Sequence, residues 1–419
     1  MINYFLFFLL VLTFHAYLFK FSNEIAVIFL ISILIKLSLI LINNNFFYLM
    51  DGNADALNFH EIMLEYLMLS KPFIFVEGLN DVYALSQLGG LIYSIFGEDI
   101  IYMQLISLSV SSTALIIFYN CLKELNFKHH IIILSCLIFV IHPFLLNYSI
   151  LTMREVYSVL ILLIILLCFL KYFNSKNPVF IVLSFLPFIF IYFINGGLIV
   201  AYFVFFFFIL KPNFSNKNKK FLSIFIYFIL FSSVSLIFLY ILIDTLNVPY
   251  LRNVKELIFD LNPDRIIVSQ EYIQLKESSN ANYPLFLISN GNLVDFIFKS
   301  ILRYFYFLFS PFPWDISSYK QIFGLLDPFI HLFFVLLIYK NFSLIIKNEK
   351  LLFILVLYFI LTLTYSFGVA NFSQGIRHKT KFVPLLMLIS CPFYFKYLKG
   401  LFFSLGFNRN LTRIDREKK

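Results

Sequence analysis

Long apolar runs recur along almost the whole chain, with shorter polar segments between them. Most are about 15–22 residues long, which is the length that a helix needs to cross a bilayer. Such runs must be helical, because lipid offers no partner to an open backbone. The pattern therefore predicts an all-α polytopic membrane protein with about 11–13 transmembrane helices. The predicted spans are 2–19, 25–42, 100–120, 131–149, 156–173, 179–194, 197–210, 221–243, 322–340, 351–367 and 382–398.

Two further apolar stretches, 82–96 and 296–311, are short or interrupted by polar residues. We expect each to be a helix that lies in the membrane interface or dips into it. They belong to the two longest polar regions, 43–99 and 244–321. We interpret residues 1–419 as a single membrane domain that carries an acidic loop, a larger loop subdomain and a basic tail at 399–419.

The composition agrees with a membrane protein and argues against several other classes. Hydrophobic residues make up 61% of the chain and charged residues 13%. The first span has neither a basic segment before it nor a small-residue cleavage site after it, so we expect a retained helix. All four cysteines lie in or at the ends of spans, which favours neither a disulfide framework nor a cysteine-rich metal site. Walker A, GxGxxG and HExxH motifs are absent, so soluble nucleotide or zinc chemistry is not supported.

The distribution of charge predicts the orientation. With the C-terminal tail in the cytoplasm, the inner loops hold 19 Lys and Arg against 5 Asp and Glu. The outer loops then hold 12 basic and 17 acidic residues, as the positive-inside bias requires. That bias also explains the net charge of +9, so we expect no nucleic-acid partner. Loops 43–99 and 244–321 and the short loop 368–381 would face the outer side.

The first candidate cluster is Asp51 and Asp55 in the acidic outer loop. If a helix begins near Asn53, carboxylates four residues apart lie on one side of it. Such a pair can bind a divalent metal, or one acid can act as a base toward a sugar hydroxyl. The alternative is a pair of solvated loop acids. Because two acids without a third ligand do not make a metal site, we expect no cofactor.

The second cluster is Arg154 and Glu155, in the short connection between two spans. Charges at this depth need a partner or a water-filled cavity. One interpretation is structural, with Glu155 at the positive end of a helix dipole. An arginine on the outer side opposes the positive-inside bias, which favours a functional role for Arg154 with Glu155 in support.

The third cluster stands directly before the last span and comprises Arg377, His378, Lys379 and Lys381. These basic groups also face outward against the bias. Their predicted purpose is to neutralise phosphate, with Arg forming bidentate contacts and Lys acting as a point charge. Anionic lipid headgroups are the alternative partner. Arg303, inside an aromatic run of the large loop, joins them as a candidate phosphate ligand.

Scattered residues along most of the chain resemble a known class. They are the segment 89–97, His142-Pro143-Phe144 with Arg154-Glu155, the segment 311–314, and the stretch from Asn371 to Lys379. The pattern is similar to bacterial GT-C-type membrane glycosyltransferases and to the lipid-linked oligosaccharide polymerases of O-antigen and capsule clusters. The resemblance implies a GT-C-like fold and a polyprenyl-(pyro)phosphate-linked sugar substrate. It also implies a catalytic acid in the first large outer loop, which maps to Asp51 or Asp55.

The leading functional hypothesis is polymerisation of oligosaccharide repeat units linked to undecaprenyl pyrophosphate, at the outer face of a bacterial inner membrane. Arg154, Arg377 and Lys379 would hold the pyrophosphate leaving group, and a chain-length regulator protein would be a further partner. The alternative is a GT-C glycosyltransferase with a polyprenyl-phosphate sugar donor. A lipid-linked glycan flippase is a third reading. It is disfavoured because Lys36 is the only clear charge in the middle of a span and the acids lie in long outer loops.

Overall fold

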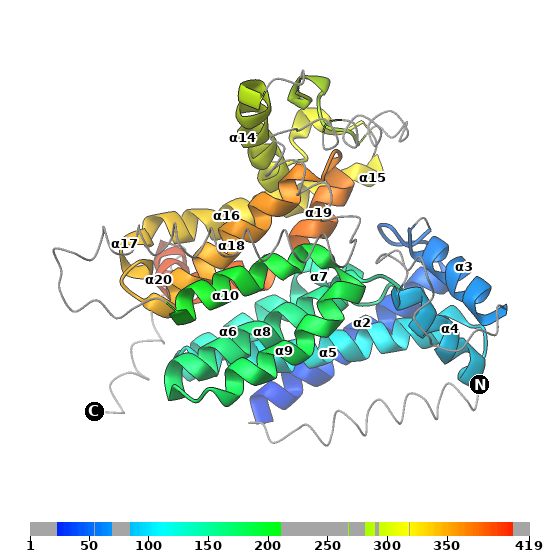
Figure 1. Cartoon of the computed structure of the whole chain (residues 1–419), viewed down its shortest axis with the longest axis horizontal. Coiled ribbons are helices and arrows are strands. Elements are labelled where there is room, and N and C mark those ends of the chain that lie inside the picture. Colours follow the sequence, from blue (N-terminus) through cyan, green and yellow to red (C-terminus); the bar gives the residue numbers. More distant parts are fainter. Residues whose placement is uncertain are drawn as a thin grey trace.

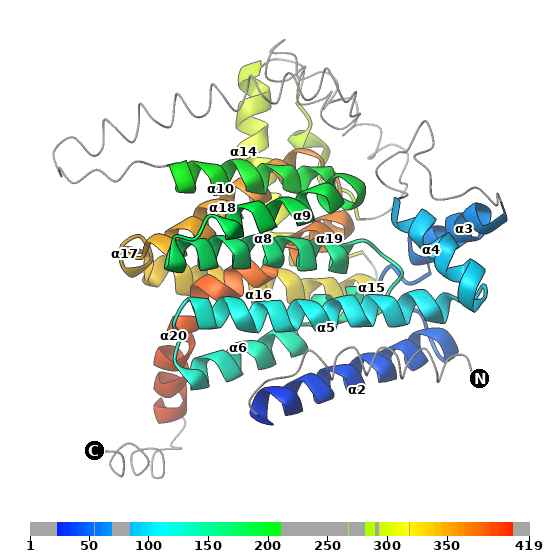
Figure 2. The same ribbon diagram turned by 60° about the horizontal axis from the view of Figure 1, so that its bottom comes forward.

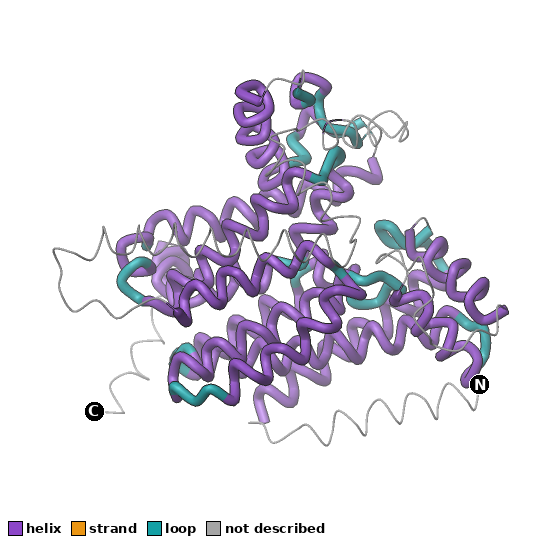
Figure 3. Tube along the Cα trace, in the orientation of Figure 1, coloured by secondary structure: helices purple, strands orange, loops and turns teal. Residues whose placement is uncertain are grey.

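A computed structural model describes residues 23–53, 55–68, 84–210, 267, 281–289, 293–317 and 319–404. Within these ranges the regular structure is helical (Figure 3). The predicted spans 2–19 and 221–243 lie outside the described residues. So do most of the large loop 244–321 and the tail beyond residue 404.

Five helices among the described residues are long and apolar enough to cross a membrane. They confirm the predicted all-α polytopic class. These segments are Glu24–Asn45, Ile100–Glu124, Glu155–Ser175, Phe323–Lys340 and Glu349–Phe367, and they correspond to α2, α5, α8, η5 with α16, and α18. Shorter apolar helices accompany them, so the total of 11–13 spans stays a prediction.

Long helices packed side by side form the centre of the bundle. Helix α5 (Ile100–Glu124) packs along α8 (Glu155–Ser175), and α8 packs along α9 (Val179–Ile194), as Figures 1 and 2 show. Helix α10 (Val200–Leu210) follows, and it packs against α18 (Glu349–Phe367). The rings of Phe169 and Phe353 stack with their centroids 3.6 Å apart, which joins α8 to α18 in the core.

The predicted span 131–149 is not one helix, which corrects the sequence interpretation. It divides into α6 (His129–Ile141) and α7 (Pro143–Tyr148). His142 has an extended backbone, with φ −63° and ψ 120°, because the following proline ring disfavours the helical conformation. The imidazole Nδ1 of His142 accepts a hydrogen bond from the backbone N–H of Leu145 at 3.3 Å and caps the new helix. The break turns α7 toward the acidic loop.

The acidic loop 43–99 is largely a helical hairpin. Helices α3 (Asp55–Met68) and α4 (Ala84–Phe96) pack against each other at one end of the bundle (Figure 2). The hydroxyl of Thr152 donates a hydrogen bond of 2.8 Å to the carbonyl of Ala56. The amide of Asn147 donates one of 3.0 Å to the carbonyl of Met50. These bonds hold the start of the hairpin on the segment that links α7 to α8.

The basic segment 368–381 was expected to be a loop, but it contains a helix, α19 (Phe372–Thr380). Asn371 caps it, since its side-chain oxygen accepts a hydrogen bond of 2.8 Å from the N–H of Gln374. Helix α20 (Val383–Ser404) follows directly. The stretch 296–311 falls in α14 (Leu293–Phe309), and its place in the membrane interface stays a prediction. Helix α16 (Leu326–Lys340) and the short helices α15 (Tyr319–Ile322) and α17 (Phe342–Ile345) complete the described part.

We predict that Gly90→Val destabilises the α3–α4 hairpin. A Cβ atom on Gly90 would lie 2.9 Å from the Cβ of Tyr66 and 3.0 Å from the backbone oxygen of Met63, so the helices would have to separate. Overpacking of this kind costs about 1–3 kcal/mol. Thermal unfolding in lipid nanodiscs measures the loss. Ser94→Ala, on the exposed side of the same helix, is the control, and equal stability of both variants would contradict the prediction.

Candidate functional site

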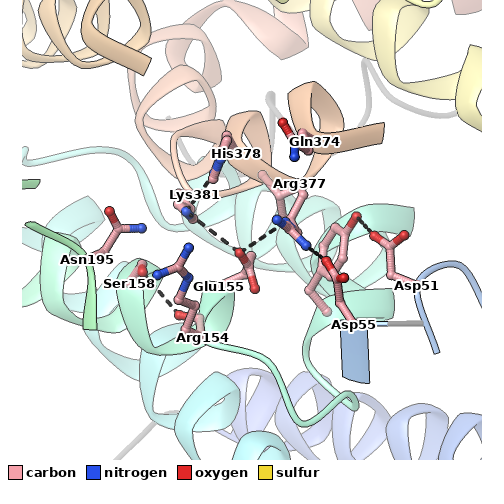
Figure 4. Close-up of polar contacts among 12 residues, drawn as sticks. Asp51, Asp55, Arg154, Glu155, Ser158, Asn195, Gln374, Arg377, His378 and Lys381 are labelled. Carbon is pink, nitrogen blue, oxygen red and sulfur yellow. Dashed lines mark hydrogen bonds and ion pairs between the residues drawn. The ribbon is translucent and has the colours of Figure 1, made fainter. Parts of the chain in front are cut away.

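The site forms where α19 lies across the start of α8. Arg377 and Lys381, one helical turn apart, both face the carboxylate of Glu155 (Figure 4). The Arg377 Nε atom is 3.6 Å from Glu155 Oε1, and the Lys381 Nζ atom is 3.7 Å from the same oxygen. The Glu155 side chain is only 1% exposed, and neither carboxylate oxygen has a hydrogen bond within the described residues. Two cations and the positive end of the α8 dipole therefore hold a buried anion.

The acidic hairpin reaches the same cations from the other side. Asp55, the first residue of α3, forms an ion pair with the guanidinium of Arg377 (Figure 4). Its side chain is 48% exposed. Asp51 Oδ2 accepts a hydrogen bond of 2.8 Å from the hydroxyl of Tyr148. Asp51 Oδ1 lies 3.4 Å from the hydroxyl of Ser373 on α19. The two predicted carboxylates thus share one site, although only Asp55 pairs directly with Arg377.

Arg154 differs from the other cations because its charge is not neutralised within the described residues. Its backbone carbonyl accepts a hydrogen bond of 3.1 Å from Ser158, but the structure gives its guanidinium no ion pair there. Figure 4 shows this guanidinium extending toward Lys381 and Glu155. An arginine beside other cations, without its own carboxylate, is suited to bind an anionic group.

Asn195 is a residue of the site that the sequence analysis missed. It precedes the turn at 196–199 between α9 and α10. Its side-chain oxygen accepts a hydrogen bond from the hydroxyl of Tyr365. Its amide nitrogen is buried without a hydrogen-bond partner in the described part of the chain. In Figure 4 that nitrogen points toward Arg154. The sequence gives only a weak signal that Asn195 belongs to the site. It is a polar residue at the end of an apolar span, and two glycines follow it.

Lys381 and His378 form the buried part of the basic side. The Lys381 ammonium is 2.8 Å from His378 Nδ1 and lies 5.1 Å from the centroid of the Tyr365 ring. Burial lowers the pKa of Lys381 to about 7. Burial, and then the positive charges of Lys381 and Arg377, hold the pKa of His378 well below its ordinary value. His378 is therefore neutral near pH 7, and its unprotonated ring nitrogen can accept a hydrogen bond from the ammonium of Lys381.

The structure does not bring Lys379 and Arg303 into this cluster. Lys379 points to the opposite side of α19, where it pairs with the buried Asp327 of α16. Its ammonium also donates to the carbonyl of Ser310 at 3.1 Å. Arg303 donates to the carbonyl of Val369, with its Nε atom 3.0 Å away. Both side chains brace α19 against its neighbours, while Asp51, Asp55, Arg154, Glu155, Arg377 and His378 gather at the site.

The carboxylates of the site are dispersed between cations and hydrogen-bond donors. Among the described residues, no group of three or more His, Cys, Asp or Glu side chains is placed to hold a metal ion. Each acid of the cluster instead faces a nitrogen or a hydroxyl. The arrangement is that of a mixed charge cluster, which can bind an anion on one side and a hydroxyl on the other.

No protein-family model matches the sequence, and no curated protein does. The structure is similar to the crystal structure of the oligosaccharyltransferase of Archaeoglobus fulgidus in the apo form, with a TM-score of 0.50 and 14% sequence identity. The similarity covers 94% of this chain and 53% of the archaeal chain, so this chain spans about half the length of that protein. At this identity the likeness concerns the fold alone. It supports the expected fold of a helical, multi-pass membrane protein.

We predict that Lys379→Met destabilises the protein by about 3–5 kcal/mol, because it leaves the buried carboxylate of Asp327 without its cation. Adding Asp327→Leu should recover most of this loss, since the pair is then replaced by apolar groups. Chemical unfolding in detergent micelles compares the two variants. A double variant as unstable as the single one would contradict the assignment of Lys379 to a bracing ion pair.

We predict that stability rises with pH between about 7 and 9.5 through Lys381. The folded protein loses this proton near pH 7, whereas the unfolded chain keeps it up to about pH 10.4. The unfolded state therefore binds more protons in this window, and raising the pH favours folding. Melting temperatures across the window should rise less in Lys381→Met than in the wild type. Parallel pH profiles would contradict the lowered pKa.

Proposed function

We propose that this protein is a membrane glycosyltransferase of the GT-C type that takes a sugar from a polyprenyl-phosphate-linked donor. One observation carries the proposal. Segments far apart in the sequence, namely the α3 hairpin, the start of α8 and helix α19, bring Asp55, Glu155, Arg154, Arg377 and Lys381 to one site. Such a convergence of charge at the end of a helical bundle is suited to a reaction in which a lipid-linked phosphate is the leaving group.

The basic side of the site is suited to the phosphate. Arg154 and Lys381 provide the cations, and the unpartnered amide of Asn195 provides a further donor. Guanidinium groups bind two phosphate oxygens at once. When the bond between the sugar and the phosphate breaks, negative charge develops on the phosphate oxygen. Cations already in place stabilise that charge more than they stabilise the bound donor.

The acidic side is suited to the acceptor. Asp55 is half exposed and reachable, and it forms an ion pair with Arg377. In the proposed step, Asp55 removes the proton of an acceptor hydroxyl while that oxygen bonds to the anomeric carbon. The bond from that carbon to the phosphate breaks, and its electron pair leaves with the phosphate. Asp51, engaged by Tyr148 and Ser373, orients the loop that carries the base.

Polymerisation of repeat units linked to undecaprenyl pyrophosphate is the second candidate. The observation in its favour is that three cations, Arg154, Arg377 and Lys381, share one cluster, so that each of two phosphates could contact a cation. A chain-length regulator would then be a partner. In either case the proposed location is the outer side of a bacterial inner membrane. The cluster lies at one end of the helices and not along them, which disfavours a flippase.

We predict that Arg154→Gln lowers the rate of glycan transfer by about 100-fold, as expected when one stabilising donor is lost from a transition state. The fold should survive, because no ion pair of this guanidinium is broken. The substitution is made in the native host, and surface glycans are analysed by gel and mass spectrometry. The matched control is Lys347→Gln, which changes an exposed lysine two residues before the start of α18.

The product distinguishes the two candidates. A transferase variant yields glycans that lack one sugar but keep their range of chain lengths. A polymerase variant yields chains of a single repeat unit. An unchanged glycan profile in Arg154→Gln, with normal protein levels, would overturn both assignments.

A further inference from the structure

Lys36 is a charged residue in the middle of the apolar helix α2 (Asn23–Asn45). It is only 3% exposed. Its ammonium donates a hydrogen bond of 2.8 Å to the hydroxyl of Ser111 on α5, and the described residues include no carboxylate paired with it. A cation within a membrane-spanning helix is costly unless it reaches polar partners or water. One hydroxyl leaves two of its three N–H donors unused.

A cavity beside Lys36 provides room for the water that its ammonium needs. It lies between α2, α5, α6, α7, α8 and the end of α19, and its volume of about 20 Å³ leaves room for about one water molecule. Its polar lining consists of Lys36, Ser111, Tyr148, Ser149, Glu155 and Thr380. The buried lysine and the buried glutamate of the site therefore line one cavity. Both oxygens of Glu155 also lack hydrogen bonds within the described residues.

These groups match the requirements of ordered water. A buried water needs two to four polar partners and room for at least one molecule. Here the ammonium of Lys36 is the donor, and the Glu155 oxygens are the acceptors. The hydroxyls of Tyr148, Ser149 and Thr380 already donate elsewhere, so they too can only accept. Water-mediated bonds are nearly as favourable as direct ones, so a hydrated cavity would satisfy both buried charges at once.

We propose that ordered water in this cavity links the ammonium of Lys36 to the carboxylate of Glu155, so that Lys36 positions Glu155 from within the membrane-spanning bundle. Arg377 and Lys381 hold the carboxylate from α19, and Arg154 flanks it on its own segment. Lys36 holds it from the opposite side. Lys36 is thus a positioning residue, and its effect on catalysis rests on the proposed function.

A double-mutant cycle of Lys36→Met and Glu155→Gln tests the link without any substrate. Melting temperatures are measured in nanodiscs made of zwitterionic lipid. Each single variant should melt several degrees below the wild type, because each leaves one buried charge unbalanced. The double variant should melt no lower than the less stable single variant, since both charges are gone. Lys36→Arg should keep most of the stability, and Ser38→Ala, on the exposed side of α2, is the control.

Additive losses in the double variant would overturn the proposal. A Lys36→Met protein as stable as the wild type, or more stable, would overturn it too. Either result would mean that the two charges are independent. Because no sugar transfer is measured, this outcome does not depend on whether the protein is a glycosyltransferase.

The catalytic consequence is measured as the rate of sugar transfer. Lys36→Met should lower this rate, and Lys36→Arg, which keeps a cation at the same place, should restore most of it. A Lys36→Arg protein that is as stable as the wild type but as slow as Lys36→Met would contradict the positioning role.

Discussion

The buried carboxylate of Glu155, held between Arg377 and Lys381, is the interaction on which the rest of the site depends. A charge removed from water must be compensated, and breaking such a pair costs far more than a surface ion pair. The two cations stand on the short helix α19, so the need to neutralise Glu155 fixes that helix on the start of α8. The acidic hairpin then reaches the same place, because Asp55 pairs with the outer side of Arg377.

Helical periodicity divides the basic run of α19 into two functions. Residues four apart lie on one face of a helix, and so Arg377 and Lys381 both face the site. Lys379 falls between them in sequence and points the other way, toward Asp327. The same few residues thus supply the charges of the site and the anchor that holds them. The arrangement gives α19 a defined orientation without a large apolar face of its own.

Much of the fold was predictable from the sequence, because lipid permits only helices for long apolar runs. The bias against outward-facing basic residues also directed attention to Arg154 and the α19 cluster, which the structure places side by side. The sequence did not show which basic residues lie in the site and which brace α19. Assigning Lys379 and Arg303 to bracing requires the phase of α19 and the position of Asp327, which are tertiary facts. The break at His142-Pro143 was predictable, because the sequence shows the proline. The position of Asn195 in the site was not, because it depends on a hydrogen bond from Tyr365, which is far away in the sequence.

The charge cluster around Glu155 is proposed to bind the phosphate of a polyprenyl-linked sugar. The most direct measurement is native mass spectrometry of the purified protein, in nanodiscs of zwitterionic lipid, titrated with a polyprenyl monophosphate. We expect saturable binding of one polyprenyl monophosphate per chain. Inorganic pyrophosphate should weaken this binding, because it competes for the same cations. Occupancy that grows without saturation and is indifferent to pyrophosphate, as for an ordinary lipid, would contradict the proposal.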